Sequence, residues 1–115
     1  MNASPRLSPT AIAAIKDRGN DIFVSVACVW EAATKHRQGK LPEAAVLVDS
    51  PSTVLSRMGF LPLPIQLEHA RLGGSLVADH KDPFDRLLAA QALLEGLTLV
   101  SADTAFDTLL VPRLW

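Results

Sequence analysis

Four acidic residues on or next to the expected helices and strands of this chain could form a site at one edge of the sheet. Glu31 lies about two turns into one predicted helix, and Asp103 follows a predicted strand by a few residues. Asp82 and Asp85 open another predicted helix, and they join the other two if that helix crosses the sheet obliquely. Two carboxylates about 4 Å apart repel by roughly 4 kcal/mol at an effective dielectric of 20. A cluster of this kind therefore needs a bound cation or raised pKa values.

Hard oxygen ligands with no soft partner nearby suit Mg²⁺ or Mn²⁺ better than zinc. Such a metal can activate water and neutralise the charge that develops on a phosphate during hydrolysis. A Ser-His-Asp order, a P-loop and a Gly-x-Gly-x-x-Gly motif are all absent, so no rival mechanism is offered. The structural alternative stays open: Asp82 and Asp103 are good helix N-caps, and Glu31 could simply face solvent.

A basic run follows Glu31 and contains Lys35, Arg37 and Lys40. Such a run usually forms a solvated helix end, where cations suit the helix dipole. Its alternative role is to hold phosphates without sequence preference. The three histidines are not spaced as a metal-binding set, and Cys28 is expected to be a small buried residue.

Composition narrows the class of protein. The chain has 115 residues, 49% of them hydrophobic, with 11 Lys and Arg against 12 Asp and Glu. This predicts one domain and excludes a strongly basic protein that wraps nucleic acid, while a local basic patch stays possible. A single cysteine excludes an internal disulfide. No leader sequence or membrane span is recognised, so we expect a cytoplasmic protein with no membrane partner.

The chain alternates short apolar runs with helical patterns, which favours an α/β fold with a parallel, helix-covered sheet. In such sheets, ligands bind beyond the carboxyl ends of the strands. Proline at 62 and 64 marks an edge strand. The expected strands cover 22–25, 60–65, 97–100 and 109–114. The expected helices cover 8–18, 26–38, 67–76 and 83–95, with two further helical stretches on either side of a break at 49–51 and a short helix over 104–109.

Three ordered motifs resemble the PIN-domain family, and specifically its VapC-like toxin branch. Residues 23–31 read FVSVACVWE and are similar to the region of the family's second acidic residue. Residues 80–92 read HKDPFDRLLAAQA and are similar to the third acidic motif, and residues 97–103, LTLVSAD, resemble the last one. The resemblance extends over nearly the whole chain from Leu7 onward.

The resemblance implies a PIN-like (Rossmann-like) parallel sheet of about four strands and a Mg²⁺- or Mn²⁺-dependent endoribonuclease. It implies that Glu31, Asp85 and Asp103 are the catalytic metal-site acids and that Asp82 is an auxiliary metal ligand. It also implies that Arg86 binds a substrate phosphate or an antitoxin carboxylate. The implied partners are RNA, a cognate antitoxin protein in a type II toxin–antitoxin pair, and a second copy in a homodimer.

The chain departs from the family at its start. Family members begin with a strand that ends in an aspartate, followed by a helix, whereas here residues 1–3 lead almost directly into Pro5. We therefore expect the first strand, its aspartate and most of the first helix to be absent. The two strands that neighbour the missing strand would then carry unpaired backbone N–H and C=O groups. A start site assigned too far downstream, a natural remnant, and strands that close up or come from a partner all explain this.

Two functions of different classes follow. The first is a metal-dependent endoribonuclease that acts as a toxin. The second is a catalytically impaired PIN remnant that binds an antitoxin or a second copy, with the apolar surface around Trp30 and Leu41 as its contact face. The RNA target, the cleavage site and the identity of the antitoxin are not encoded in any motif.

Overall fold

The computed structural model describes residues 7–115. The expected absence of a first strand and its aspartate concerns residues 1–6, which lie outside the described part. The described chain forms two compact units, Ile15–Pro64 (unit 1) and Leu7–Ala14 with Ile65–Trp115 (unit 2). Helix α1 (Pro9–Lys16) lies where the chain passes from one unit to the other, and the Ser8 hydroxyl caps it by accepting from the Ala11 N–H at 3.0 Å.

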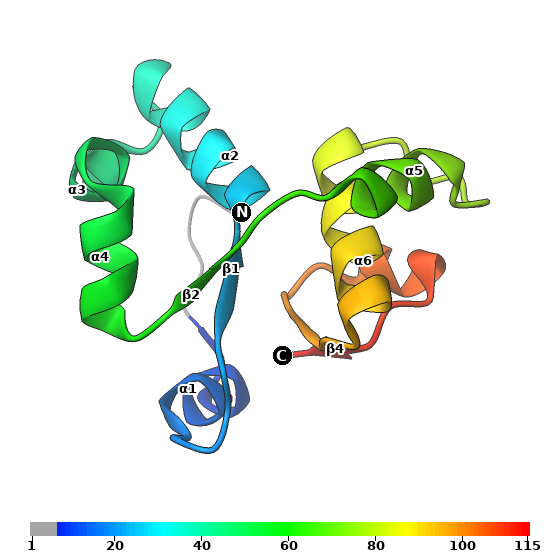
Figure 1. Cartoon of the computed structure of the whole chain (residues 1–115), viewed down its shortest axis with the longest axis horizontal. Coiled ribbons are helices and arrows are strands. Elements are labelled where there is room, and N and C mark those ends of the chain that lie inside the picture. Colours follow the sequence, from blue (N-terminus) through cyan, green and yellow to red (C-terminus); the bar gives the residue numbers. More distant parts are fainter. Residues whose placement is uncertain (1–6) are drawn as a thin grey trace. The chain divides into compact units, whose positions relative to one another are not determined.

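Unit 1 begins with a strand that runs directly into a helix. Strand β1 (Phe23–Ser25) ends at Ser25, whose hydroxyl accepts from the Ala27 N–H at 3.1 Å and caps α2 (Val26–Arg37). The helix ends before Gly39, which has a φ of 75° that glycine adopts without steric cost. The sequence predicted both the cap and this end. Figure 1 shows β1 leading directly into α2.

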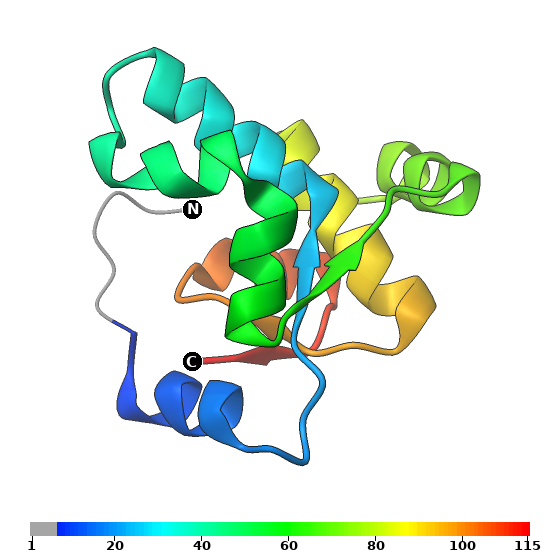
Figure 2. The same ribbon diagram turned by 60° about the vertical axis from the view of Figure 1, so that its left-hand side comes forward.

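The rest of unit 1 returns the chain to pair with β1. A short 3-10 helix η1 (Pro42–Ala44) leads to α3 (Ala45–Asp49), and α4 (Pro51–Met58) follows with proline at its first position. Strand β2 (Leu61–Leu63) then lies parallel to β1, and Figure 2 shows the two arrows side by side. Pro62 lies opposite Val24. The core of this unit consists of Ala32, Leu41 and Ala44, with Leu47 and Val48 packed against it.

Unit 2 is built around two packed helices. Helix α5 (Leu67–Ser75) contacts α6 (Pro83–Glu95), and both helices are visible in Figure 1. Gln66 and His69 form a reciprocal capping box at the start of α5, in which the Gln66 N–H donates to His69 Nδ1 at 2.9 Å. Helix α6 has the bounds that the sequence predicted, with Asp82 as N-cap and Gly96 at a φ of 66° after its end.

A second parallel strand pair closes unit 2. Strand β3 (Leu99–Val100) pairs with β4 (Arg113–Leu114), and the 3-10 helix η2 (Thr104–Leu109) connects them. Side chains from α6, from η2 and from the turn before β4 form the core of this unit. The fully buried members of this cluster are Ala89, Ala92, Phe106, Leu109 and Val111.

The mixed helix–strand class and the parallel pairing were predicted, but the expected sheet of about four strands is not what the structure forms. Residues 7–115 form two strand pairs, β1–β2 in unit 1 and β3–β4 in unit 2. The expected strand over 109–114 is reduced to two residues because η2 extends to Leu109 and Leu110 adopts a φ of 58°. Among the described residues, no helix is long and apolar enough to cross a membrane.

The close contact between α5 and α6 requires a residue without a Cβ at position 73, where the chain has Gly73. A Cβ there would lie 3.3 Å from the Arg86 carbonyl oxygen and 3.4 Å from Leu87 Cα, whereas a Cβ at Gly74 would meet nothing within 4 Å. We expect Gly73→Val to lower the free energy of unfolding by about 1–3 kcal/mol through overpacking. Gly74→Ala should raise it by up to about 1 kcal/mol because alanine favours the helix. Chemical denaturation of both variants tests this, and equal effects would contradict the packing described.

Candidate functional site

The start of α6 places two acidic side chains for different reasons. Asp82 is the N-cap: its Oδ1 accepts from the Phe84 N–H at 2.9 Å and from the Asp85 N–H at 3.4 Å. Pro83 occupies the first helical position, where a missing N–H costs nothing. Asp85 follows in the first turn, where a negative charge suits the helix dipole. Asp82 is therefore the helix N-cap that the sequence predicted.

His80 holds the Asp85 side chain. Its Nε2 lies 2.8 Å from Asp85 Oδ2, and the two side chains are only 14% and 18% exposed. An ionised carboxylate can only accept, so Nε2 carries the hydrogen in this pair. The imidazole also stacks on the buried Phe106 ring, with centroids 6.1 Å apart and planes 23° apart. The pair is thus anchored to the core of unit 2.

Asp103 lies after β3, as predicted, and caps η2. Its Oδ1 accepts from the Ala105 N–H at 2.9 Å, and its own N–H donates to the Ser101 hydroxyl at 3.1 Å. The carboxylate is exposed, unlike that of Asp85. Its structural role as a cap is therefore also present.

Two carboxylates of unit 2, Asp82 and Asp103, act electrostatically on Asp85. Burial raises the pKa of Asp85 above its usual value, the His80 hydrogen bond opposes this rise, and the negative charges of Asp82 and Asp103 add to it. Asp82, Asp85 and Asp103 thus all lie in unit 2, and the charges of Asp82 and Asp103 act on Asp85. Repulsion among them is what a divalent cation would relieve.

Arg86 makes contacts that its position in the sequence did not reveal. Its Nε donates to the Gly73 carbonyl at 2.9 Å, its Nη1 donates to the carbonyls of Ala78 at 3.3 Å and His80 at 2.8 Å, and its Nη2 donates to Leu76 O. Four of the five N–H groups of the guanidinium are thereby used on backbone oxygens. This placement favours a structural role over the expected binding of a phosphate or an antitoxin carboxylate.

Glu31 belongs to unit 1, where it lies on α2 and pairs with Lys35. Its Oε1 is 2.9 Å from Lys35 Nζ, one turn further along the helix. Burial raises the pKa of Glu31, but hydrogen bonding and the positive charge of Lys35 help to bring it below its ordinary value. Burial and the Glu31 charge also raise the pKa of the Cys28 thiol, which indicates an unreactive thiol. Glu31 is thus an ionised, paired carboxylate.

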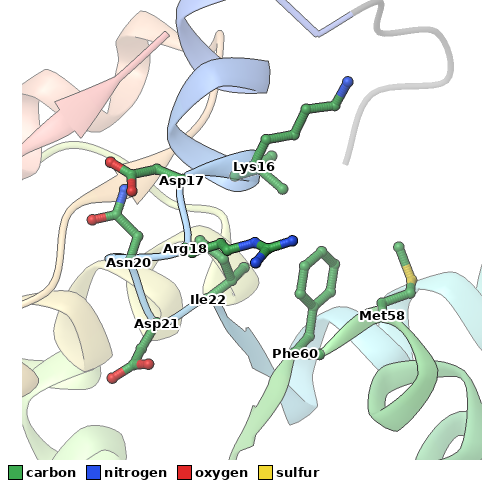
Figure 3. Close-up of a pocket in the computed structure, with 10 residues that line it drawn as sticks. Lys16, Asp17, Arg18, Asn20, Asp21, Ile22, Met58 and Phe60 are labelled. Carbon is green, nitrogen blue, oxygen red and sulfur yellow. The ribbon is translucent and has the colours of Figure 1, made fainter.

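The other two cations of the basic run lie at the end of α2. Arg37 and Lys40 are exposed, as a solvated helix end requires. Unit 1 also has a surface hollow of about 570 Å³, shown in Figure 3, that contains no predicted site residue. Its lining comes from the end of α1, the turn before β1 and the turn before β2, and includes Lys16, Arg18 and Phe60.

The carboxylate oxygens of unit 2 are of the type that Mg²⁺ and Mn²⁺ prefer as ligands. Asp85 uses Oδ2 and Asp103 uses Oδ1 within the protein, which leaves each a second oxygen of the type these ions prefer. However, among residues 7–115 no group of three or more His, Cys, Asp or Glu side chains is placed to hold a metal ion. The oxygen donors therefore fit such an ion in kind, and the described structure provides fewer than a complete set.

The sequence analysis missed the supporting contacts of this site. His80 was set aside because the three histidines lack metal-site spacing, yet it contacts the central carboxylate. The signal that could have found it is its position five residues before Asp85, just ahead of the capping aspartate. No signal short of the fold shows that Arg86 meets Gly73, thirteen residues away.

Comparison with known proteins gives the class of this fold and site. The family model for the PIN domain matches residues 5–109, which is most of the chain. The chain belongs to the PIN domain family, whose fold is generally that of a nuclease. Searches of curated proteins and of solved structures gave no match.

The raised pKa of Asp85 predicts a pH-dependent cost of folding. The folded state holds the Asp85 proton more tightly than the unfolded state does. The protonated carboxyl therefore contributes fully to stability below its ordinary pKa of 3.8, and this contribution is lost as pH rises through its pKa in the folded protein. Asp85→Asn removes this loss, so its melting temperature should rise relative to wild type between about pH 3 and pH 7.

Asp107 supplies the matched control within the same unit. A hydrogen bond from Arg113 lowers the pKa of this exposed carboxyl. Its contribution is therefore present above its ordinary pKa and lost as pH falls through the lowered value. Asp107→Asn should change the melting temperature slightly and in the opposite direction. A pH dependence of the same sign in both variants would contradict the assignment.

Proposed function

We propose that this protein is a Mg²⁺- or Mn²⁺-dependent endoribonuclease of the VapC-like branch of the PIN family, and the toxin of a type II toxin–antitoxin pair. The observation that carries the proposal is the carboxylate group at the start of α6, in a chain that matches the PIN family over residues 5–109. Hydrolysis of an RNA phosphodiester is the chemistry that such a group serves in a nuclease fold.

Asp85 and Asp103 would hold the ion, with Asp82 as an auxiliary ligand and Glu31 as the fourth acid. When bound, the ion would supply an activated water and neutralise charge on the phosphate. Asp85 is the central residue of this proposal because its carboxylate is partly buried and feels the negative charges of Asp82 and Asp103. Asp82 fixes the first turn of α6 and so sets where the Asp85 backbone lies.

Substrate binding is assigned to the basic end of α2. Arg37 and Lys40 are exposed, and Lys35 is tied to Glu31 by an ion pair, so the first two are the better phosphate contacts. Contacts of this type position RNA and carry no sequence information. Arg86 retains one N–H group beyond its four backbone contacts, which supports only a minor part in phosphate or antitoxin binding.

The proposed partners follow from the same branch of the family. They are a cognate antitoxin that inhibits the enzyme and a second copy of the chain in a homodimer, in the cytoplasm. Apolar side chains that lie open in the described structure, Trp30 at 66% exposure among them, are suited to contacts of this kind.

Cleavage of a labelled RNA in Mn²⁺ tests the proposal. We expect Asp85→Asn and Asp103→Asn each to reduce the rate by about 100-fold or more, because each removes a charged oxygen ligand. Asp49→Asn is the matched control, since Asp49 is exposed at the end of α3 in unit 1 and should leave the rate unchanged. Addition of EDTA should abolish cleavage by the wild type.

Equal cleavage by wild type and Asp85→Asn would contradict the proposed enzyme. A folded wild-type chain that cleaves no RNA and yet binds an antitoxin peptide would instead favour the alternative, a catalytically impaired PIN module that acts by binding. Circular dichroism of each variant shows that it is folded before rates are compared.

A further inference from the structure

We propose that His80 is a positioning residue for Asp85 and that Arg86 holds His80 in place. This inference deepens the proposed function because it concerns the orientation of the central carboxylate, and it rests on that function for its catalytic meaning. The geometry itself is independent of any metal or substrate.

The first step is the contact between the two side chains. His80 Nε2 donates to Asp85 Oδ2 at 2.8 Å, and the imidazole ring also stacks on Phe106. With one oxygen held in this way, the carboxylate has a defined rotamer and presents Oδ1 to any ligand. A partner that fixes a ligating side chain from behind typically changes affinity or activity by about 10- to 100-fold.

The second step is the segment that carries His80. Residues 76–82 contain no helix or strand, so they need other contacts to stay ordered. Arg86 supplies these by donating to the carbonyls of Leu76, Ala78 and His80 from within α6. It also donates to Gly73 on α5, which ties the beginning of the segment to the same guanidinium. Arg86 is adjacent to Asp85, so one turn of helix positions both the carboxylate and the residue that orients it.

Substitutions at His80 separate positioning from simple packing. His80→Gln can place an amide N–H where the imidazole Nε2–H lies, whereas His80→Phe keeps a ring against Phe106 and removes the donor. The readout is the χ1 angle of Asp85, obtained from three-bond proton couplings by NMR. We expect one fixed rotamer in wild type and His80→Gln, and averaging over rotamers in His80→Phe.

Substitutions at Arg86 test the second step. Lysine has a single ammonium group and cannot reach four carbonyls as a planar guanidinium does. Arg86→Lys should therefore speed amide hydrogen exchange in residues 76–82 and average the Asp85 rotamer. Arg71→Met is the matched control, because Arg71 is an exposed cation on α5 that pairs only with Glu68 among the described charged residues. A fixed Asp85 rotamer in both His80→Phe and Arg86→Lys would overturn the inference.

RNA cleavage supplies the functional arm. Among folded variants, His80→Phe should lower the rate by about tenfold or more, and His80→Gln should recover it to within about threefold of wild type. An unchanged rate in His80→Phe would show that orientation of Asp85 by His80 has no catalytic role. A wild type without activity would refute the proposed ribonuclease, while the couplings would still decide whether His80 positions Asp85.

Discussion

The network of hydrogen bonds around the Arg86 guanidinium is the interaction on which the acidic site of unit 2 depends. It joins α5, the irregular segment after it and the first turn of α6 through four backbone carbonyls. Charged donors make stronger hydrogen bonds than neutral ones, and a planar guanidinium can satisfy several acceptors at once. Because His80 is one of the residues held, the network extends to the Asp85 carboxylate. The close packing of α5 on α6 at Gly73 allows the arginine to reach across.

The same arrangement makes ionisation of Asp85 unfavourable. Asp85 is partly buried and feels the charges of two other carboxylates, and the hydrogen bond and charge of His80 counter the resulting rise of its pKa. A site that favoured stability alone would have a neutral side chain there. Perturbed carboxyl groups of this kind are typical of functional sites, although structural networks also produce them. Asp82 and Asp103 each cap a helix and also add negative charge near Asp85, so their structural role does not conflict with the proposed functional one.

Local signals in the sequence predicted most of the helices. Ser25, Asp82 and Asp103 cap the elements expected, and Gly96 ends α6 where the pattern indicated. The strands were predicted too long, because apolar runs such as 60–65 and 109–114 do not reveal where backbone pairing stops. The supporting contacts of Arg86 and His80 depend on how segments meet in space, and no periodicity encodes them. The acids of unit 2 were predicted as a group, whereas Glu31 belongs to the other unit and is paired with Lys35.

The proposed ribonuclease requires Asp85 and Asp103 to bind one divalent cation together. The most direct test is a calorimetric titration of the folded 115-residue chain with Mn²⁺, in parallel with the Asp85→Asn/Asp103→Asn double variant and Asp49→Asn. We expect wild type and Asp49→Asn to bind with similar affinity and the double variant to bind at least about tenfold more weakly, since both charged oxygen ligands are lost. Equal affinity in the double variant, or no binding by the folded wild type, would contradict it.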